Sequence, residues 1–162
     1  MDMVRAGALI YGLRGFHKGF VKVRQALTFE TKICHISNVR KGEGVSYDYA
    51  WRAPEDTRVA TLPFGYADGY PRNLRDRGFV TIRGVRCPII GVICMDQCMF
   101  EIDMRSSGTR PRLDPQIGDE VLLVGAQGGA RISIDDMAEQ IGTIPHELCC
   151  AFGLRMPKVY TR

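Results

Sequence analysis

Residues 26–36 read ALTFETKICHI, a stretch in which apolar and polar side chains alternate. Phe29, Thr31 and Ile33 recur at the two-residue spacing of a β-strand. The polar segment 40–44 follows and contains two glycines, so it predicts a turn. The stretch therefore predicts a strand that ends in a turn.

Further short runs of the same kind follow along the chain, at residues 57–62, 79–83, 85–91, 98–102 and 120–124. Gly, Pro and Asp separate them at intervals of about ten residues, which is typical of a barrel or a sandwich. This rhythm predicts that most of the chain folds as a β-structure.

Helical spacing is found near the C-terminus. Ser133 and Asp136 resemble a capping box, and the apolar residues after them recur at helical spacing up to Gly142. A second short helix is predicted to begin near Pro145 and to end at Gly153. The predicted fold class is therefore all-β, a Greek-key-like β-barrel domain with one or two short helices near the C-terminus.

The composition is that of an ordinary soluble globular domain. The 162 residues are 45% hydrophobic and 25% charged, enough for one core and too few for two. The first apolar run is too short for a signal peptide, and none approaches the roughly 20 residues of a membrane span, so we expect a cytoplasmic protein without membrane contact. The net charge of +4 comes from cations spread along the chain, so nucleic acid is not an expected partner.

The chain contains six cysteines, but without a signal peptide a disulfide framework is not expected. A zinc site could be drawn through Cys94, Cys98, His146, Cys149 and Cys150. The close Cys-x2-Cys pair of a zinc knuckle is missing, and both segments are apolar enough to belong to a core. We therefore predict no metal site.

Residues 4–12, VRAGALIYG, are nearly continuous in apolar side chains. Such a run predicts a strand buried on both faces. The sequence supplies no helices to flank it, so we expect this strand to be the end of another domain.

Three segments carry chemistry: 45–47 (VSY), 65–72 (GYADGYPR) and 93–97 (ICMDQ). Each lies in a predicted loop or at a strand end, where sites are commonly built. They offer tyrosines, an arginine, an aspartate and backbone donors. They contain no Ser-His-Asp set and no phosphate-binding glycine loop. From the residues alone, strand-loop packing and a catalytic site both remain open.

In order and spacing these segments resemble the C-terminal domain of alanine racemase. The resemblance also includes the segments 4–7, 118–121 and 142–144, and it covers nearly the whole chain. It implies a pyridoxal-phosphate enzyme that acts as a homodimer, with an N-terminal (β/α)8 barrel and a C-terminal β domain. Residues 1–15 would then be the last strand of the barrel, and residues 16–162 the β domain. The family interconverts L- and D-alanine, which supplies D-alanine for peptidoglycan.

The resemblance also implies roles for individual residues. Racemisation by two-base proton transfer needs one base on each face of the Cα atom; one is the cofactor lysine of the barrel, and the other is Tyr47, acting on the partner subunit. A tyrosine that ionises near neutral pH needs about 4 kcal/mol of preferential phenolate stabilisation. The implied cofactor-binding residues are Arg5, Gly7, Ala8 and His146. The implied substrate-binding residues are Met95, Tyr66 and Arg72.

The chain departs from the family pattern at three positions. His146 replaces a tyrosine, Val92 an arginine, and Asp48 a glycine. A broad-spectrum or serine racemase of the same family is therefore an alternative, and a stand-alone β-barrel binding module without catalysis is another. None of the five lysines matches the motif of the cofactor lysine, so we expect the isolated chain to be inactive.

Overall fold

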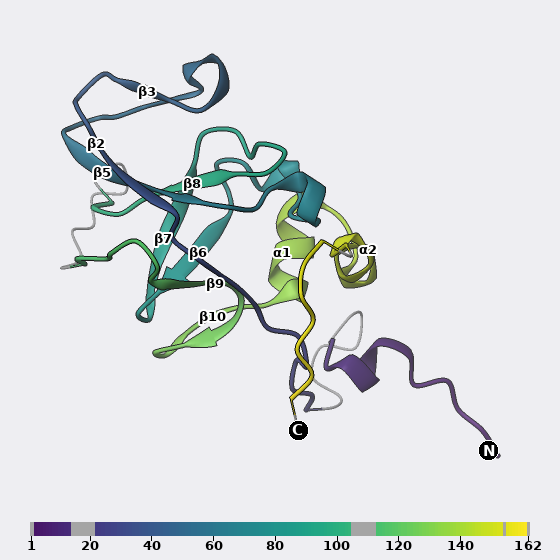
Figure 1. Cartoon of the computed structure of the whole chain (residues 1–162). Coiled ribbons are helices and arrows are strands. Elements are labelled where there is room, and N and C mark those ends of the chain that lie inside the picture. The colour runs from purple at the N-terminus through teal and green to yellow at the C-terminus, as the bar shows by residue number, and fades with distance from the viewer. Residues whose placement is uncertain (1, 14–21, 105–112, 154, 162) are drawn as a thin grey trace.

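The computed structural model describes residues 2–13, 22–104, 113–153 and 155–161 (Figure 1). Their strands are β1 (Phe29–Lys32), β2 (His35–Val39), β3 (Gly44–Val45), β4 (Trp51–Arg52), β5 (Thr57–Leu62), β6 (Phe79–Ile82), β7 (Val85–Ile90), β8 (Cys98–Glu101), β9 (Glu120–Gln127) and β10 (Ala130–Ile132). Their helices are α1 (Ile134–Ile141), α2 (Pro145–Ala151) and the 3-10 helices η1 (Gly7–Tyr11), η2 (Tyr47–Tyr49), η3 (Tyr66–Asp68) and η4 (Arg72–Leu74).

Most strands form one antiparallel sheet in the order β1-β9-β6-β7-β8-β5-β2, and β10 pairs with β9. The strands β6, β7 and β8 are consecutive neighbours, and β5, which precedes them in the chain, pairs with the last of them, β8. This is a Greek-key arrangement. β3 and β4 form a separate two-stranded hairpin. The all-β fold class and the late position of the helices are thus confirmed.

One extended segment joins the two ends of the strand order. The Ile33 N–H donates to the Asp119 carbonyl beside β9, and the Cys34 N–H donates to the Thr61 carbonyl of β5, both at 3.0 Å. The predicted strand over 26–36 is therefore divided into β1 and β2, because the chain changes partner between these residues. Figure 1 shows this segment in dark blue, crossing the sheet. The sheet consequently curls into a barrel-like body.

The core lies inside this curled sheet. Phe100, Ile89 and Leu123 are fully or almost fully buried, together with side chains from α1. Phe64 packs edge-on against Phe29 of β1 and against Tyr70, with ring centroids 5.5 and 5.1 Å apart. These aromatic contacts attach the loop after β5 to the core.

The C-terminal helices follow the sequence pattern. The Asp136 N–H donates to Ser133 Oγ at 3.0 Å, and Gly142 ends α1 in the left-handed conformation. α2 begins at Pro145, where a missing N–H has no consequence for helix bonding. Figure 1 shows the two helices together at one end of the sheet.

The predicted buried strand at residues 4–12 is not present in this structure. Residues 2–6 have no regular structure, and η1 follows with exposed Ile10 and Tyr11. Gly7 and Gly12, at the two ends of η1, both have positive φ, so the chain turns at each end of this short helix and is not extended. The predicted domain boundary between residues 15 and 16 lies outside the described residues.

The described cysteines are all free thiols. Burial raises the pKa of Cys87 to about 12 and shifts the pKa of Cys98 upward as well. Within the described ranges, no group of three His, Cys, Asp or Glu side chains could hold a metal ion. In the same ranges, no helix has the length and apolar character needed to cross a membrane.

Two buried threonines make a matched test of the interior. Thr81 Oγ1 has no hydrogen-bond partner among the described residues, whereas Thr57 Oγ1 donates to Glu101 Oε1 at 3.1 Å. We expect Thr81→Val to raise the free energy of unfolding by about 1 kcal/mol, because it removes an unpaired hydroxyl from the core. Thr57→Val should lower it by about 1–3 kcal/mol, because the buried Glu101 loses a donor. Urea denaturation of both variants measures the difference, and equal destabilisation would contradict the assignment.

Candidate functional site

Tyr47 lies at the tip of the β3–β4 hairpin. Val45 pairs with Trp51, and η2 connects the two short strands. The side chain of Tyr47 is 67% exposed and that of Tyr49 65%. The phenol predicted to be catalytic is thus presented on the surface of the domain.

A second apolar cluster supports this hairpin. Val59, Ile90 and Met99 lie one residue out of phase with the interior residues of β5, β7 and β8, so they face the outer side of the sheet. Val45 and Trp51 pack on them. The hairpin therefore folds back across the sheet, toward the loop that follows β7.

The backbone around Tyr47 is strained. Ser46 has φ 71° and ψ −179°, Asp48 has φ 57° and ψ 20°, and Tyr49 has φ 49°. Non-glycine residues in such regions cost about 1–3 kcal/mol each and persist only where their surroundings hold them. Contacts to neighbouring loops must hold this segment.

The first of these contacts joins Ser46 to the loop after β7. Ser46 Oγ donates to the Val92 carbonyl and accepts from the Val92 N–H, both at 3.0 Å. Gly91 makes the approach possible, because a Cβ atom there would lie 2.6 Å from the Ser46 Cβ. Two of the three sequence segments are thus brought together.

The third segment lies against the same loop. The N–H groups of Tyr66 and Ala67 donate to the carbonyls of Cys94 and Met95, both at 3.0 Å. A Cβ on Gly65 would lie 2.1 Å from the Cys94 oxygen, so only glycine fits. The loop 91–97 is therefore the centre on which the other two segments rest.

Arg155 ties the C-terminal segment to both loops. Its guanidinium pairs with Asp96 Oδ1 at 2.6 Å and with Asp68 Oδ1 at 3.3 Å. The hydrogen bond to Asp96, with the charge of Asp68, raises the pKa of Arg155. Asp68 is buried and also accepts the Gly65 N–H at 2.9 Å. Sequence analysis missed Arg155, because it lies 59 residues from Asp96 and no local spacing connects them.

The predicted substrate-binding residues surround this centre. Met95 is 53% exposed, Tyr66 is 43% exposed, and Arg72 is exposed at the start of η4. An open groove of about 430 Å³ runs from Tyr66 to Thr143 and α2. His146 is exposed on the first turn of α2.

The other residues predicted to bind the cofactor lie elsewhere. Arg5 is exposed, and the Leu9 N–H closes the first turn of η1 on Ala6, which leaves the N–H groups of Gly7 and Ala8 outside the helical bonding. Figure 1 places this N-terminal segment at the opposite end of the molecule from the β3–β4 hairpin. The structure therefore does not bring Arg5, Gly7 and Ala8 together with Tyr47 within one chain.

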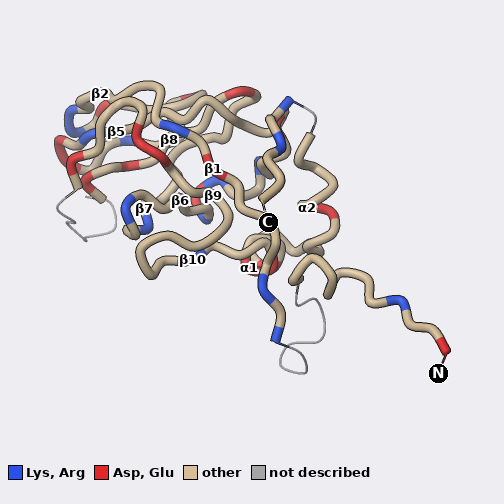
Figure 2. The backbone as a smooth tube through the Cα atoms, turned by 60° about the horizontal axis from the view of Figure 1, so that its bottom comes forward, with Lys and Arg blue, Asp and Glu red and all other residues tan. Residues whose placement is uncertain are grey.

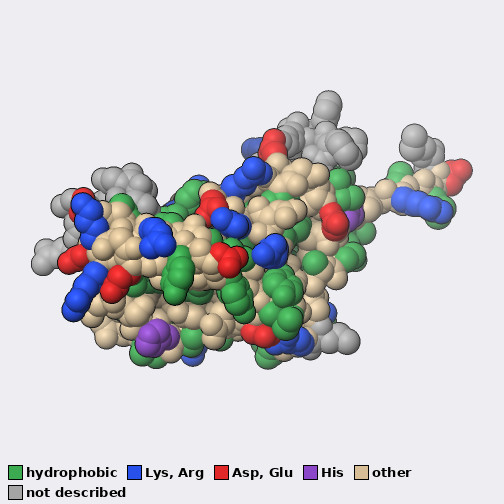
Figure 3. Space-filling view, turned by 90° about the horizontal axis from the view of Figure 1, so that it is seen from above, with side chains coloured by type: hydrophobic (Ala, Val, Ile, Leu, Met, Phe, Trp, Pro, Cys, Tyr) green, Lys and Arg blue, Asp and Glu red, His purple; other side chains and the backbone are tan. Residues whose placement is uncertain are grey.

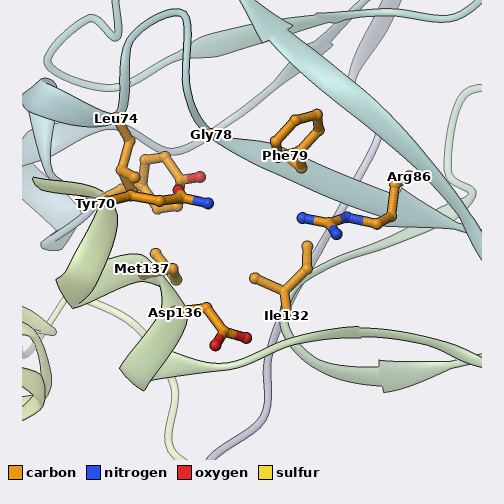
Figure 4. Close-up of a pocket in the computed structure, with 9 residues that line it drawn as sticks. Tyr70, Leu74, Gly78, Phe79, Arg86, Ile132, Asp136 and Met137 are labelled. Carbon is orange, nitrogen blue, oxygen red and sulfur yellow. The ribbon is translucent and has the colours of Figure 1, made fainter.

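A small separate cavity lies between β6, β7, β10 and α1. Figure 4 shows the Arg86 guanidinium beside the Phe79 ring, with the Asp136 carboxylate across the cavity. Arg86 lies 4.6 Å from the ring centroid. The cavity has room for about one water (roughly 10 Å³), and none of the predicted site residues lines it.

Charges of both signs are interleaved over the surface. Figure 2 shows Lys and Arg alternating with Asp and Glu along the body, and Figure 3 shows the same mixture on the face above the sheet. Exposed hydrophobic side chains lie among them in Figure 3.

The fold and the loop cluster define an all-β domain that presents a tyrosine-bearing site on its surface. Residues 26–160 match the family described as "Alanine racemase, C-terminal domain". The chain is 39% identical over 162 residues to an alanine racemase of Halothermothrix orenii, and this match covers 99% of the chain and 41% of the relative. The chain therefore belongs to the alanine racemase C-terminal domain family.

Solved structures give the same result. Alanine racemase from E. faecalis matches 99% of the chain and 41% of its own, with a TM-score of 0.88 and 31% identity. Alanine racemase from Bartonella henselae, with covalently bound pyridoxal phosphate, matches 96% of the chain and 40% of its own, with a TM-score of 0.84 and 28% identity. The chain thus spans about two-fifths of the length of the relatives that it matches.

The close packing of the segment 65–72 on the loop 91–97 can be tested at one glycine. Gly65 has an ordinary extended φ of −158°, so an alanine there meets no backbone strain and only the steric contact with the Cys94 and Met95 backbone. We expect Gly65→Ala to lower the free energy of unfolding by about 1–3 kcal/mol. Gly153→Ala is the control, because the nearest atom to its Cβ is 4.0 Å away, and it should change stability by less than about 0.5 kcal/mol. Equal effects in thermal unfolding would contradict the steric argument.

Proposed function

We propose that this chain is the β domain of a pyridoxal-phosphate-dependent alanine racemase, which interconverts L- and D-alanine as a homodimer in the cytoplasm and so supplies D-alanine for peptidoglycan. The observation that carries the proposal is the exposed Tyr47, held in a strained loop that is bonded to the loop of Met95. The relatives described above are named alanine racemase, which supports the reaction class.

The separation of the site residues supports a shared active site. The β3–β4 hairpin, which carries Tyr47, lies at one end of the domain, and the N-terminal segment with η1 lies at the other (Figure 1). In a two-fold dimer, each of two equivalent sites takes one set of residues from each subunit. We propose that Tyr47 of one subunit completes the cofactor site of its partner.

The residues of the N-terminal segment suit the cofactor. Gly7 is exposed, and among the described residues no atom outside its chain neighbours lies within 4 Å of the position that a Cβ would take there, which leaves space beside this backbone for a phosphate group. The N–H groups of Gly7 and Ala8 precede the first hydrogen bond of η1, from Leu9 to Ala6, so they would donate to the phosphate, and His146 would supply a further donor from α2. Arg5 would donate to the pyridine nitrogen, because guanidinium has only N–H donors, no acceptor, and stays protonated at neutral pH. The bound cofactor supplies the electron sink that acidifies the Cα proton.

The protein residues then move and direct the proton. Inversion at Cα needs a base on each face, and Tyr47 acts on one of them. The Met95 N–H holds the substrate carboxylate, and Tyr66 and Arg72 line the entrance. A tyrosine at the entrance favours a small side chain such as the methyl group of alanine.

The valine at position 92, where the family often has arginine, is too buried to contact substrate. The Val92 side chain is only 4% exposed, so it packs into the domain and does not line the entrance. The comparisons favour neither a serine or broad-spectrum racemase nor a stand-alone binding module, since the relatives that cover the chain are named alanine racemase.

Tyr47→Phe in the full-length enzyme tests the catalytic role. We expect kcat to fall by a factor of about 10²–10⁴ with little change in KM, because the general base is lost while substrate contacts remain. Tyr49→Phe is the matched control, since Tyr49 is equally exposed on the same hairpin. A coupled D-alanine assay measures both. Wild-type turnover in Tyr47→Phe would refute the role.

Mixing two inactive dimers tests the shared site. The Tyr47→Phe enzyme is combined, after partial denaturation and refolding, with a variant that lacks the cofactor lysine of the barrel. Half of the statistical mixture is heterodimer, and each heterodimer has one intact site, so about a quarter of wild-type activity should return. No recovery, with heterodimers present by native mass spectrometry, would place Tyr47 and the lysine on the same subunit.

A further inference from the structure

We propose that Ser46 is a positioning residue for Tyr47, and that its hydroxyl fixes the phenol relative to the loop that binds the substrate carboxylate. This inference rests on the proposed function. It assigns a role to a side chain that touches neither cofactor nor substrate.

The first argument is the backbone conformation. With φ 71° and ψ −179°, Ser46 occupies a region that is essentially restricted to glycine. A glycine would adopt it without strain, yet the position carries a side chain. The hydroxyl must therefore contribute something that glycine cannot.

The second argument is what the hydroxyl does. Ser46 Oγ bonds both backbone polar groups of Val92, at 3.0 Å each, and so reproduces one rung of a β-ladder. Cys94 Sγ lies 4.0 Å away, at the edge of the same contact. Two bonds to one residue fix the direction of the loop as well as its distance.

The third argument is that the loop to which Ser46 bonds is itself held rigidly. Val92 and Ile93 are buried, so the start of the loop is anchored in the body of the domain. Met95 follows two residues later, with its carbonyl held by the Ala67 N–H. Ser46 thus connects the residue beside the base to the anchored end of the carboxylate-binding loop. Because a misplacement of about 1 Å can cost about 100-fold in rate, this connection matters for proton transfer.

The test uses Ser46→Gly and Ser46→Ala in the full-length holoenzyme. Both remove the hydroxyl, but only glycine also relieves the strain, so Ser46→Gly should melt at a higher temperature than Ser46→Ala. In both, kcat/KM should fall by about 10–100-fold in both directions, as a racemase equilibrium requires. Arg83→Gly is the control, because it relieves a positive φ (49°) at the β6–β7 turn, away from the site, and should leave the kinetics unchanged.

The decisive readout is the Cα-deuterium isotope effect measured from each enantiomer. If Tyr47 is misplaced, its proton transfer becomes more rate-limiting. The isotope effect should then rise for the enantiomer whose proton Tyr47 removes and fall for the other. Unchanged isotope effects, with activity reduced only in proportion to folded enzyme, would overturn the positioning role. If Tyr47→Phe leaves racemisation intact, the proposed catalytic role of Tyr47 is wrong. If Tyr47→Phe abolishes racemisation but the Ser46 variants behave like wild type, only the positioning role of Ser46 is wrong.

Discussion

The structure depends on the change of hydrogen-bond partner between Ile33 and Cys34. Up to Ile33 the chain bonds to the β9 side of the sheet, and from Cys34 it bonds to β5. Because one extended segment contributes both β1 and β2, the two ends of the strand order are joined covalently, and the sheet has to curl. The side chains of alternate residues then enclose one interior, while the outer side of β5, β7 and β8 remains available. The site is built from that outer side.

The position of Tyr47 follows from this second surface. The β2–β5 connection could extend into solvent, but Val45 and Trp51 pack on Val59, Ile90 and Met99, and this packing carries the hairpin back toward the loop after β7. Hydrophobic burial holds the hairpin on the sheet, and the two hydrogen bonds of Ser46 to Val92 set the direction of its tip. These contacts also explain how the strained backbone at Ser46 persists, because strain at a few residues is maintained where the surrounding contacts hold the segment.

Period-two alternation and turn residues predicted most of the strands, and the capping pattern at Ser133 predicted α1. Those signals are local. The division of 26–36 into two strands was not predictable, because it depends on partners more than 25 residues away in sequence, as in the Cys34–Thr61 contact. The helical turn at residues 7–11 was missed for another reason: an apolar run alone does not distinguish a strand from a helix. The site shows the same limit, since the three segments were visible and the Arg155 pairs were not.

The two ends of the domain differ in how firmly contacts within this chain fix their geometry. The loop cluster around 91–97 is cross-linked by backbone bonds, by Ser46 and by Arg155, so its geometry is fixed within this chain. In the N-terminal segment, Arg5 and Gly7 are exposed and Ala8 is half-buried, and only η1 gives the segment regular structure. A reaction that inverts a carbon centre needs groups on two opposite faces, and one rigid surface cannot surround its substrate. In the proposed dimer, the preorganised surface of one subunit would meet the proposed cofactor-binding segment of its partner, and the orientation of Tyr47 would be set before the two subunits associate.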